Sequence, residues 1–597
     1  MTPIRYRIVA RRPTAHRFEI DCTVDDPAAD GQRFSLPTWI PGSYLIREFA
    51  RHVVAARASS AGRPVRLAKV AKDTWQAAPC NAPLTVTLDV YAHDVSVRGS
   101  YLDATRGYFN GASVFLLPEG RAAAPCEVDI VAPSHAGGER WRVATTLPRD
   151  GAAPWGFGRH RAANHDELID HPVEMSDFRH CAFEAGGAVH DVVVSGRAPF
   201  DAERLARDLA RVCQWHCDLF GGAASSRAPF DRYLFQVLAV GEGYGGLEHR
   251  SSTSLIAARR DLPAPGMGPP TDDYRSFLGL ASHEYFHSWN VKRIKPAAFV
   301  PYDLAREAYT RQLWAFEGIT SYYDDLALLR SGVVDAESWL ELVGRTATTV
   351  LRTPGRTLQS VADASFDAWI KHYRPDENTP NASVSYYAKG ALVALALDLT
   401  LRNHGSSLDV LMRELWRRHG QTGIGVPEDG LQRIAEALAG RDLAAFFDAF
   451  VEGTEELPLA DLLATHGIAF SLRRAQGVKD RGGKRGDGEP PRVAIGATLG
   501  PDLRLQHVRP GGPAENAGLA AGDTLVALDG LKASAERLDA YARDAQPGDR
   551  VAVHAFRRDE LIEASLALAA APDDTAFLAL DAAAAPEALA RRERWLA

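Results

Sequence analysis

Residues 1–175 alternate between apolar and polar positions with a period of two. Glycine, proline, asparagine or aspartate stands between the alternating segments, which are Ile4–Ile8, Phe18–Val24, Leu84–Val90 and Cys126–Ile130. Because successive side chains of a strand point to opposite faces, this period indicates strands with one buried face. The pattern predicts an N-terminal β-sandwich of antiparallel strands over residues 1–175.

The pattern then changes to helical spacing with two strand-like runs inside it. Apolar residues three and four apart predict a helix from Ala198 to Phe220, and strand-like runs follow at Tyr233–Val240 and Thr253–Ala257. Further predicted helices cover 335–351, 386–402, 407–419, 431–438 and 443–451. We assign 176–330 to a second domain and 331–470 to a helical domain.

The last part of the sequence has a different composition. Residues 471–491 are charged and rich in glycine, which predicts a flexible linker. Residues 503–530 follow the order strand, short helix around Pro513–Leu519, glycine stop and strand, and they resemble a bacterial-type PDZ domain. That resemblance places a PDZ domain at 492–573, which takes an extended peptide or the C-terminus of a protein as its ligand. Ile495–Ala497 is the nearest match to its carboxylate-binding loop. The C-terminal tail, 574–597, is rich in alanine and is predicted to form a short terminal helix.

Composition excludes several classes of function. A chain of 597 residues is too long for one core, and its 46% apolar and 24% charged residues are typical of globular domains. The formal net charge of -8 gives no basic footprint for nucleic acid, and no run of 18 apolar residues predicts a membrane span. The start at Met1 enters a strand pattern without a signal peptide, so we expect a cytoplasmic protein, or a periplasmic one if the true start lies upstream.

The segment His283-Glu-Tyr-Phe-His287 carries the candidate chemistry. On a helix, positions i and i+4 lie one above the other, so His283 and His287 can bind one metal ion. Glu284 then stands beside the ion, placed to take a proton from its bound water. The motif predicts a zinc-dependent hydrolase.

A third ligand is expected from a second helical stretch, Asp303–Asp325. Glu317 lies there in an otherwise apolar stripe with Leu313 and Thr320. Burying an unpaired carboxylate is costly, and coordination to a cation removes that cost. His283, His287 and Glu317 would complete the three protein ligands of a catalytic zinc site, with one ion per protein molecule.

Three long motifs resemble the M61 glycyl aminopeptidase family. They are His283–Pro296, Leu313–Tyr323 and Gly245–His249, and the resemblance extends over almost the whole sequence. It implies a gluzincin peptidase with one zinc ion and often a PDZ domain. Residues 176–330 would then form the thermolysin-like catalytic domain, and the helical domain 331–470 would complete the active-site cleft. It also implies peptide substrates with a small N-terminal residue such as glycine or alanine.

The glycine-rich segment 241–249 is the candidate substrate site. Gly245 and Gly246 allow a peptide to approach the backbone of an edge strand. The related M1 aminopeptidases have a Gly-x-Met-Glu-Asn stretch here, whose glutamate holds the free amine of the substrate, and by resemblance Glu248 takes that role. Leu247 and His249 depart from the M1 form, and Glu242 is a competing candidate.

A tyrosine is the expected oxyanion donor. Residues 383–391 resemble the Tyr-x-Lys-Gly-Ala helix start of gluzincin aminopeptidases, where the tyrosine hydroxyl donates to the tetrahedral intermediate. Tyr387 matches that position, with Tyr386 as the neighbouring alternative. A phenol donates a hydrogen bond without a competing positive charge.

The sequence therefore predicts a multidomain α+β zinc aminopeptidase that hydrolyses the N-terminal peptide bond. One alternative is a thermolysin-type endopeptidase, which would use the same catalytic residues on peptides without a free amine at the cleft. The other is a non-catalytic interaction protein that carries a PDZ domain.

Overall fold

The computed structural model describes residues 2–135, 137–222, 226–477 and 479–597. The protein divides into two compact units. The first consists of Met1–Tyr309 with Arg413–Val426, and the second of Thr310–Met412 with Pro427–Ala597. Over the described residues, none of the helices combines the length and the apolar character that a membrane crossing requires.

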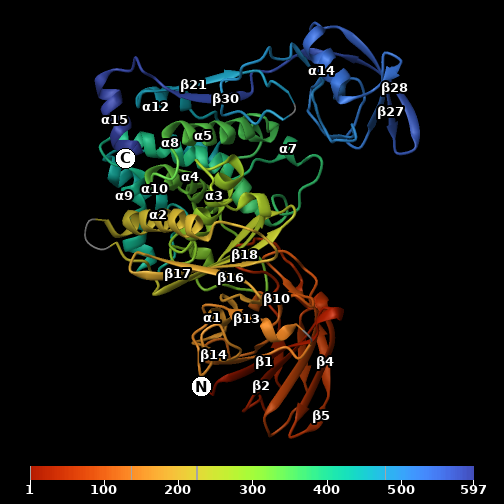
Figure 1. Ribbon diagram of the computed structural model, residues 1–597, viewed down its shortest axis with the longest axis vertical. Helices are drawn as coiled ribbons and strands as arrows, with labels where there is room; N and C mark the ends of the chain where they lie inside the picture. Colours follow the sequence, from red (N-terminus) through yellow and green to blue (C-terminus); the bar gives the residue numbers. More distant parts are fainter. Residues whose placement is uncertain (1, 136, 223–225, 478) are drawn as a thin grey trace. The chain divides into compact units, whose positions relative to one another are not determined.

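Three β-sheets around one apolar core form the N-terminal part of the first unit, drawn in red to orange in Figure 1. The largest has the order β14 (Gly158–Ala162), β12 (Cys126–Val131), β1 (Ile4–Arg12), β2 (Arg17–Val24), β8 (Leu84–Tyr91), β4 (Val53–Ser60) and β5 (Arg63–Val65). A four-stranded sheet has the order β13 (Arg142–Ala144), β15 (Val173–Ser176), β10 (Arg106–Phe109) and β9 (Ser100–Leu102). Another has the order β11 (Leu117–Pro118), β3 (Arg33–Ser35), β7 (Thr74–Ala77) and β6 (Leu67–Ala71).

The four alternating segments of the sequence all form strands of the largest sheet, and their apolar positions are buried. Along β2, for example, Phe18, Ile20, Cys22 and Val24 are at most 2% exposed. One detail of the prediction is wrong, because β1 and β12 pair in parallel with Ile4 opposite Cys126. Alternation fixes which face a side chain takes, but it carries no information on the direction of the partner strand.

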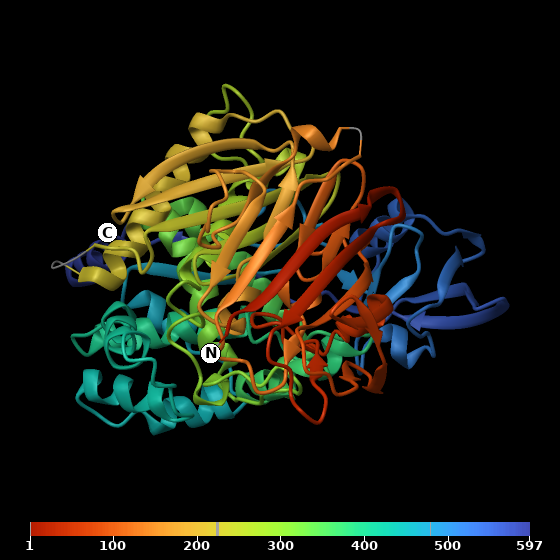
Figure 2. The same ribbon diagram turned by 90° about the horizontal axis from the view of Figure 1, so that it is seen from below.

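A five-stranded sheet follows, in the order β16 (Arg179–Ala185), β17 (Ala188–Ser195), β18 (Arg232–Val240), β20 (Ser252–Ala258) and β19 (Tyr244–Glu248). Two helices, α2 (Ala202–Gly221) and α3 (Asp272–Phe286), pack against this sheet (Figures 1 and 2). The glycine-rich strand β19 lies at the edge of this sheet and, among the described strands, pairs with β20 only, antiparallel. The candidate substrate segment therefore forms one edge of this sheet.

The second unit begins with the segment that carries Glu317. Here the structure differs from the predicted helix over Asp303–Asp325, because helical structure begins only with a π-helical turn at Trp314–Gly318 and continues as α4 (Ile319–Arg330). The side chain of Glu428 accepts from the Thr310 hydroxyl at 2.7 Å and from the Arg311 N–H at 3.1 Å, so this backbone is bound outside a helix. Tertiary contacts override the helical spacing there.

The predicted helices of the second unit include α5 (Ala336–Leu351), α8 (Ala388–Asn403), α10 (Gly430–Ala439) and α11 (Ala444–Phe447). The π-helical turn and α8 pack backbone to backbone: a Cβ atom added to Gly318 would lie 2.5 Å from Cα of Gly390. Glycine at both positions is what permits this approach.

Residues 492–573 form a small α+β region with its own apolar core. It contains a sheet of β26 (Leu531–Lys532), β25 (Thr524–Leu528), β27 (Arg550–Arg557) and β28 (Glu560–Ala567), the strand pairs β22 (Val493–Ala494) with β29 (Ala569–Ala570) and β23 (Ala497–Leu499) with β24 (Leu505–Val508), and the helices α13 (Pro513–Asn516) and α14 (Ala535–Asp544).

The segments assigned to a linker and a tail make specific contacts in the second unit. β21 (Ile468–Arg473) pairs antiparallel with β30 (Thr575–Leu580), and the Gly483 N–H donates to the Ala576 carbonyl at 2.8 Å. The terminal helix α15 (Pro586–Leu596) buries Trp595, whose indole donates to the Tyr322 hydroxyl at 3.0 Å. The tail thus contains a strand as well as the expected helix.

Candidate active site

Helix α3 presents the two histidines. The Thr271 hydroxyl caps it by accepting from the Tyr274 N–H at 3.2 Å, and acidic residues occupy its first turn, where they complement the helix dipole. His283 lies in the last turn and His287 at the C-cap, with ring centroids 4.7 Å apart. The i, i+4 spacing therefore brings both imidazoles to one side of the helix.

The orientation of the His287 ring is fixed by the backbone beyond the helix. Its Nδ1 donates to the carbonyl of Asn290 at 2.8 Å, and the residue is 1% exposed. A histidine whose Nδ1 carries the proton presents an unprotonated Nε2 as a metal ligand, and this type of support is usual for metal-binding histidines.

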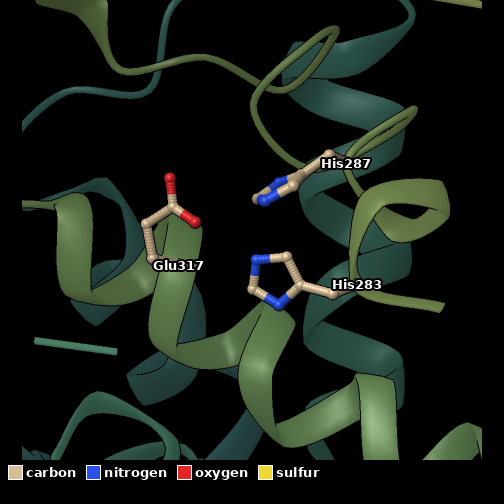
Figure 3. Close-up of side chains that lie close together, drawn as sticks. All are labelled: His283, His287 and Glu317. Carbon is tan, nitrogen blue, oxygen red and sulfur yellow. The ribbon is translucent and has the colours of Figure 1, made fainter. Parts of the chain in front are cut away.

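Glu317, the third ligand expected from the sequence, lies close to the two histidines. One ligand atom from each of His283, His287 and Glu317 lies within 4.8 Å of the other two, and Figure 3 shows the carboxylate facing both rings. Glu317 is 1% exposed and comes from the π-helical turn, a local irregularity that is frequent at functional sites. Two imidazoles and one carboxylate are a donor set suited to zinc, so these residues fit the metal that the sequence implies.

Glu284 and Glu248 are two further buried carboxylates, 5% and 3% exposed. Ligand atoms of Glu248, Glu284 and His287 also lie within 4.8 Å of one another. Keeping several carboxylates ionised in a buried place requires nearby positive charge. The arrangement is therefore suited to binding positively charged groups.

Strand β19 packs directly against Glu284. A Cβ atom at Gly246 would lie 2.0 Å from Oε1 of Glu284, so the backbone at this position touches the candidate base. At Gly42, in the Pro41–Tyr44 turn, a Cβ atom would lie 2.4 Å from both carboxylate oxygens of Glu248. The sequence leaves open whether the Pro41–Tyr44 turn is a corner of the sandwich or lines the cleft, and it does not single out Gly42 within the turn.

Gly245 and Glu242, two other candidates in the glycine-rich segment, have more open surroundings than Gly246 and Glu248. A Cβ atom added to Gly245 would meet nothing within 4 Å among the described residues, so this stretch of the edge strand is open. Glu242, the competing candidate, has a side chain that is 80% exposed and paired with Arg260 at 2.6 Å. Glu242 is therefore part of a surface ion pair, whereas Glu248 is buried.

The two candidate tyrosines differ in exposure. Tyr386 is fully buried, and burial raises its pKa well above the usual value. Tyr387 is half-buried, and its hydroxyl lies 3.0 Å from that of Tyr373. His372 packs against both tyrosine rings, with centroids 4.8 and 5.2 Å away, and burial lowers its pKa although the charge of Glu317 acts in the opposite direction.

His372 and Tyr373 were not predicted from the sequence. They lie in a stretch, 370–378, that has neither helical nor strand periodicity, and no motif marks them. Only the fold places them next to Tyr386 and Tyr387.

Comparisons with known proteins agree with the resemblance seen in the motifs. The family model for the Peptidase M61 N-terminal domain matches residues 5–177, and the model for M61 glycyl aminopeptidase matches residues 276–393. A solved structure of an aminopeptidase N family protein from Idiomarina loihiensis is 39% identical, with a TM-score of 0.95 over 100% of both proteins.

A more distant similarity is to an M1 zinc metallopeptidase from Deinococcus radiodurans, which is 14% identical. That comparison covers 77% of this protein and 94% of the other, with a TM-score of 0.46. A comparison with curated proteins found no match.

Proposed function

The chain belongs to the M61 glycyl aminopeptidase family and is a peptidase, and we propose that it is a zinc-dependent aminopeptidase acting on peptides with a small N-terminal residue. The observation that carries this proposal is the buried carboxylate of Glu248 within 4.8 Å of Glu284 and His287. An anionic group that close to the candidate base suits a substrate whose ammonium lies beside the bond to be cleaved. The preference for glycine or alanine follows from the family resemblance.

We assign zinc binding to His283, His287 and Glu317. Their donor atoms and burial support one ion per protein molecule. Bound there, zinc would lower the pKa of water and polarise the substrate carbonyl. A histidine held through Nδ1, as His287 is, loses little freedom on binding the ion.

Glu284 is the proposed general base. It follows His283 on α3 and is confined by the backbone of Gly246, which limits the positions its carboxylate can take. In this role it accepts the proton of the attacking water and delivers it to the nitrogen of the leaving amine. The same residue thus serves both halves of the proton transfer.

Glu248 is the proposed partner of the substrate ammonium. Strand β19 is an edge strand, where the substrate backbone can pair beside Gly245 and Gly246. An ion pair at Glu248 would stop the peptide after its first residue, because the carboxylate ends the cleft at that point. This is what separates an aminopeptidase from an endopeptidase with the same catalytic residues.

Tyr387 is the proposed oxyanion donor. Its side chain is partly accessible, whereas Tyr386 is fully buried, and the Tyr373 hydroxyl at 3.0 Å helps to orient it. A neutral phenol donates to the oxyanion formed in the transition state.

We further propose that residues 492–573 are a PDZ domain whose ligand is an extended peptide or the C-terminus of a protein. The short strands, the two helices and the shared core support this assignment. Gly496, in the candidate carboxylate loop, has φ of 71°, a conformation that favours glycine and can turn backbone N–H groups toward an anion.

The experiment that tests the main proposal compares Gly- and Ala-p-nitroanilide with their N-acetylated forms, using the zinc-loaded full-length protein. We expect cleavage of the free amines only, because Glu248 needs an ammonium partner. Cleavage of the acetylated substrates would favour the endopeptidase alternative, and activity that survives chelation would contradict a metal enzyme.

A further inference from the structure

The basic run after α3, Lys292-Arg-Ile-Lys295, has no part in the proposed catalysis. The loop turns back on the helix, since the Lys292 N–H donates to the His287 carbonyl at 3.1 Å. Its other end is fixed by the Lys295 carbonyl, which accepts from the N–H of Val426 at 2.7 Å. The backbone therefore holds two lysines at defined places in the first unit.

The first lysine belongs to a saturated ion cluster around Asp170. Lys292 donates to this carboxylate at 2.7 Å, Arg250 at 2.8 Å, and His249 at 3.1 Å. The Lys292 side chain is 3% exposed. The charges of Lys292 and Arg250 and the hydrogen bond from His249 hold the pKa of Asp170 well below its usual value, although burial opposes them. Asp170 thus has little capacity left for another cation.

Lys295 has no such partner. Among the described residues, no carboxylate lies within salt-bridge distance of its Nζ, which instead stands over the ring of Tyr302, 4.4 Å from the centroid. Burial, together with the nearby Lys292, lowers the pKa of Lys295 to about 8. The carboxylates of Asp166 and Asp170 act in the opposite direction and compensate its charge only in part.

A small polar cavity lies where these groups meet. Its volume is about 20 Å³, which is enough for one molecule or ion of about the size of water. The charged residues of its wall are the cations Arg250, Lys292 and Lys295 and the anions Asp166 and Asp170. The wall carries one surplus positive charge, because three cations face two carboxylates.

The cavity adjoins a larger pocket on one side and the candidate site on another. A wider pocket of about 820 Å³ shares Asp166, Lys295 and Tyr302 with it. On another side its wall includes Pro41, which precedes the Gly42 that packs on Glu248. An occupant would therefore support the turn that confines the proposed ammonium-binding carboxylate.

We propose that this cavity binds one small monovalent anion of the chloride class, with Lys295 as its main charge partner and Lys292 and Arg250 beside it. The size of the cavity and the surplus charge of its wall select for a single compact anion. The anion stabilises the first unit by compensating the half-buried ammonium of Lys295. Its effect on substrate binding, unlike the site itself, rests on the role proposed for Glu248.

The direct test uses bromide as an anomalous scatterer. Crystals of the full-length protein soaked in sodium bromide should show one anomalous peak between Lys295 and Lys292, and the Lys295→Met variant should lack it while keeping the fold. Only water in the cavity of the unchanged protein would overturn the proposal. This readout does not depend on enzymatic activity, so it separates the anion site from the proposed function.

A solution measurement provides the second arm. At constant ionic strength, replacing sodium gluconate by sodium chloride should raise Tm by about 1–2 °C, since a ligand that binds the folded state alone stabilises it. Lys295→Met should abolish this difference, whereas Lys532→Met, at an exposed lysine of β26, should keep it. An equal chloride effect in both variants would contradict a specific site.

Discussion

Gly246→Ala tests the position of the proposed base without altering any ionisable group. Gly246 does not have positive φ, so alanine fits the backbone of β19 there. The new methyl carbon would lie 2.0 Å from Oε1, 2.5 Å from Cδ and 2.7 Å from Cγ of Glu284. Ordinary contact begins at 3.4 Å, so the carboxylate has to move by about 1.4 Å.

A displacement of that size should be costly for catalysis. Misplacement of a reacting group by about 1 Å lowers rates by about 10²-fold, which corresponds to about 2.7 kcal/mol in the barrier. We therefore expect kcat for Ala-p-nitroanilide to fall about 10²-fold, with zinc content unchanged because no proposed ligand is altered.

The assay is steady-state kinetics together with metal analysis and thermal unfolding. Gly241→Ala is the matched control, because a Cβ atom there meets only the flexible guanidinium of Arg259 at 3.6 Å among the described residues. If β19 moves instead of Glu284, KM should rise through the shift of Glu248 while kcat is kept. Unchanged kcat and KM in a folded, zinc-loaded Gly246→Ala variant would refute the reasoning.

The remaining predictions concern the charged residues of the site. Glu284→Gln should lower kcat by about 10²–10⁴-fold with zinc retained, and metal analysis with kinetics checks this. Glu317→Gln should weaken zinc binding by more than about 100-fold, as measured by competition with a chelator; unchanged affinity would exclude it as a ligand. Glu248→Gln should lower kcat/KM for free aminoacyl substrates by about 30-fold or more, because a buried ammonium loses its partner, whereas Glu242→Gln at the exposed ion pair should have no effect.

Those parts of the site that lie close together in the sequence could be predicted, because helix geometry determines which side chains share a face. The four-residue spacing of His283 and His287 suffices to place two imidazoles together, and Glu317 stands out as a carboxylate in an apolar stripe. The start of its helix was predicted wrongly because helical spacing in 303–312 does not reveal that Glu428 binds this backbone from more than a hundred residues away.

The remote part of the site could not be predicted in this way. Gly42 reaches Glu248 from a loop two hundred residues earlier, and no periodicity encodes such an approach. For the same reason, the sequence does not reveal that β1 pairs in parallel with β12. It also does not reveal that β21 pairs with β30, although residues 492–573 lie between these two strands. Each depends on which segments meet, and a single sequence records only their separate preferences.

The contact of Gly318 with Gly390 has a consequence for how the second unit responds to heat. Gly318 follows the proposed zinc ligand Glu317 directly, and Gly390 lies three residues after the proposed oxyanion donor Tyr387. Because two main chains touch without intervening side chains, no rotamer change can alter their separation. The π-helical turn and the start of α8 should therefore open as one cooperative unit. The rates of amide hydrogen exchange in the two segments should then change in parallel as the temperature is varied.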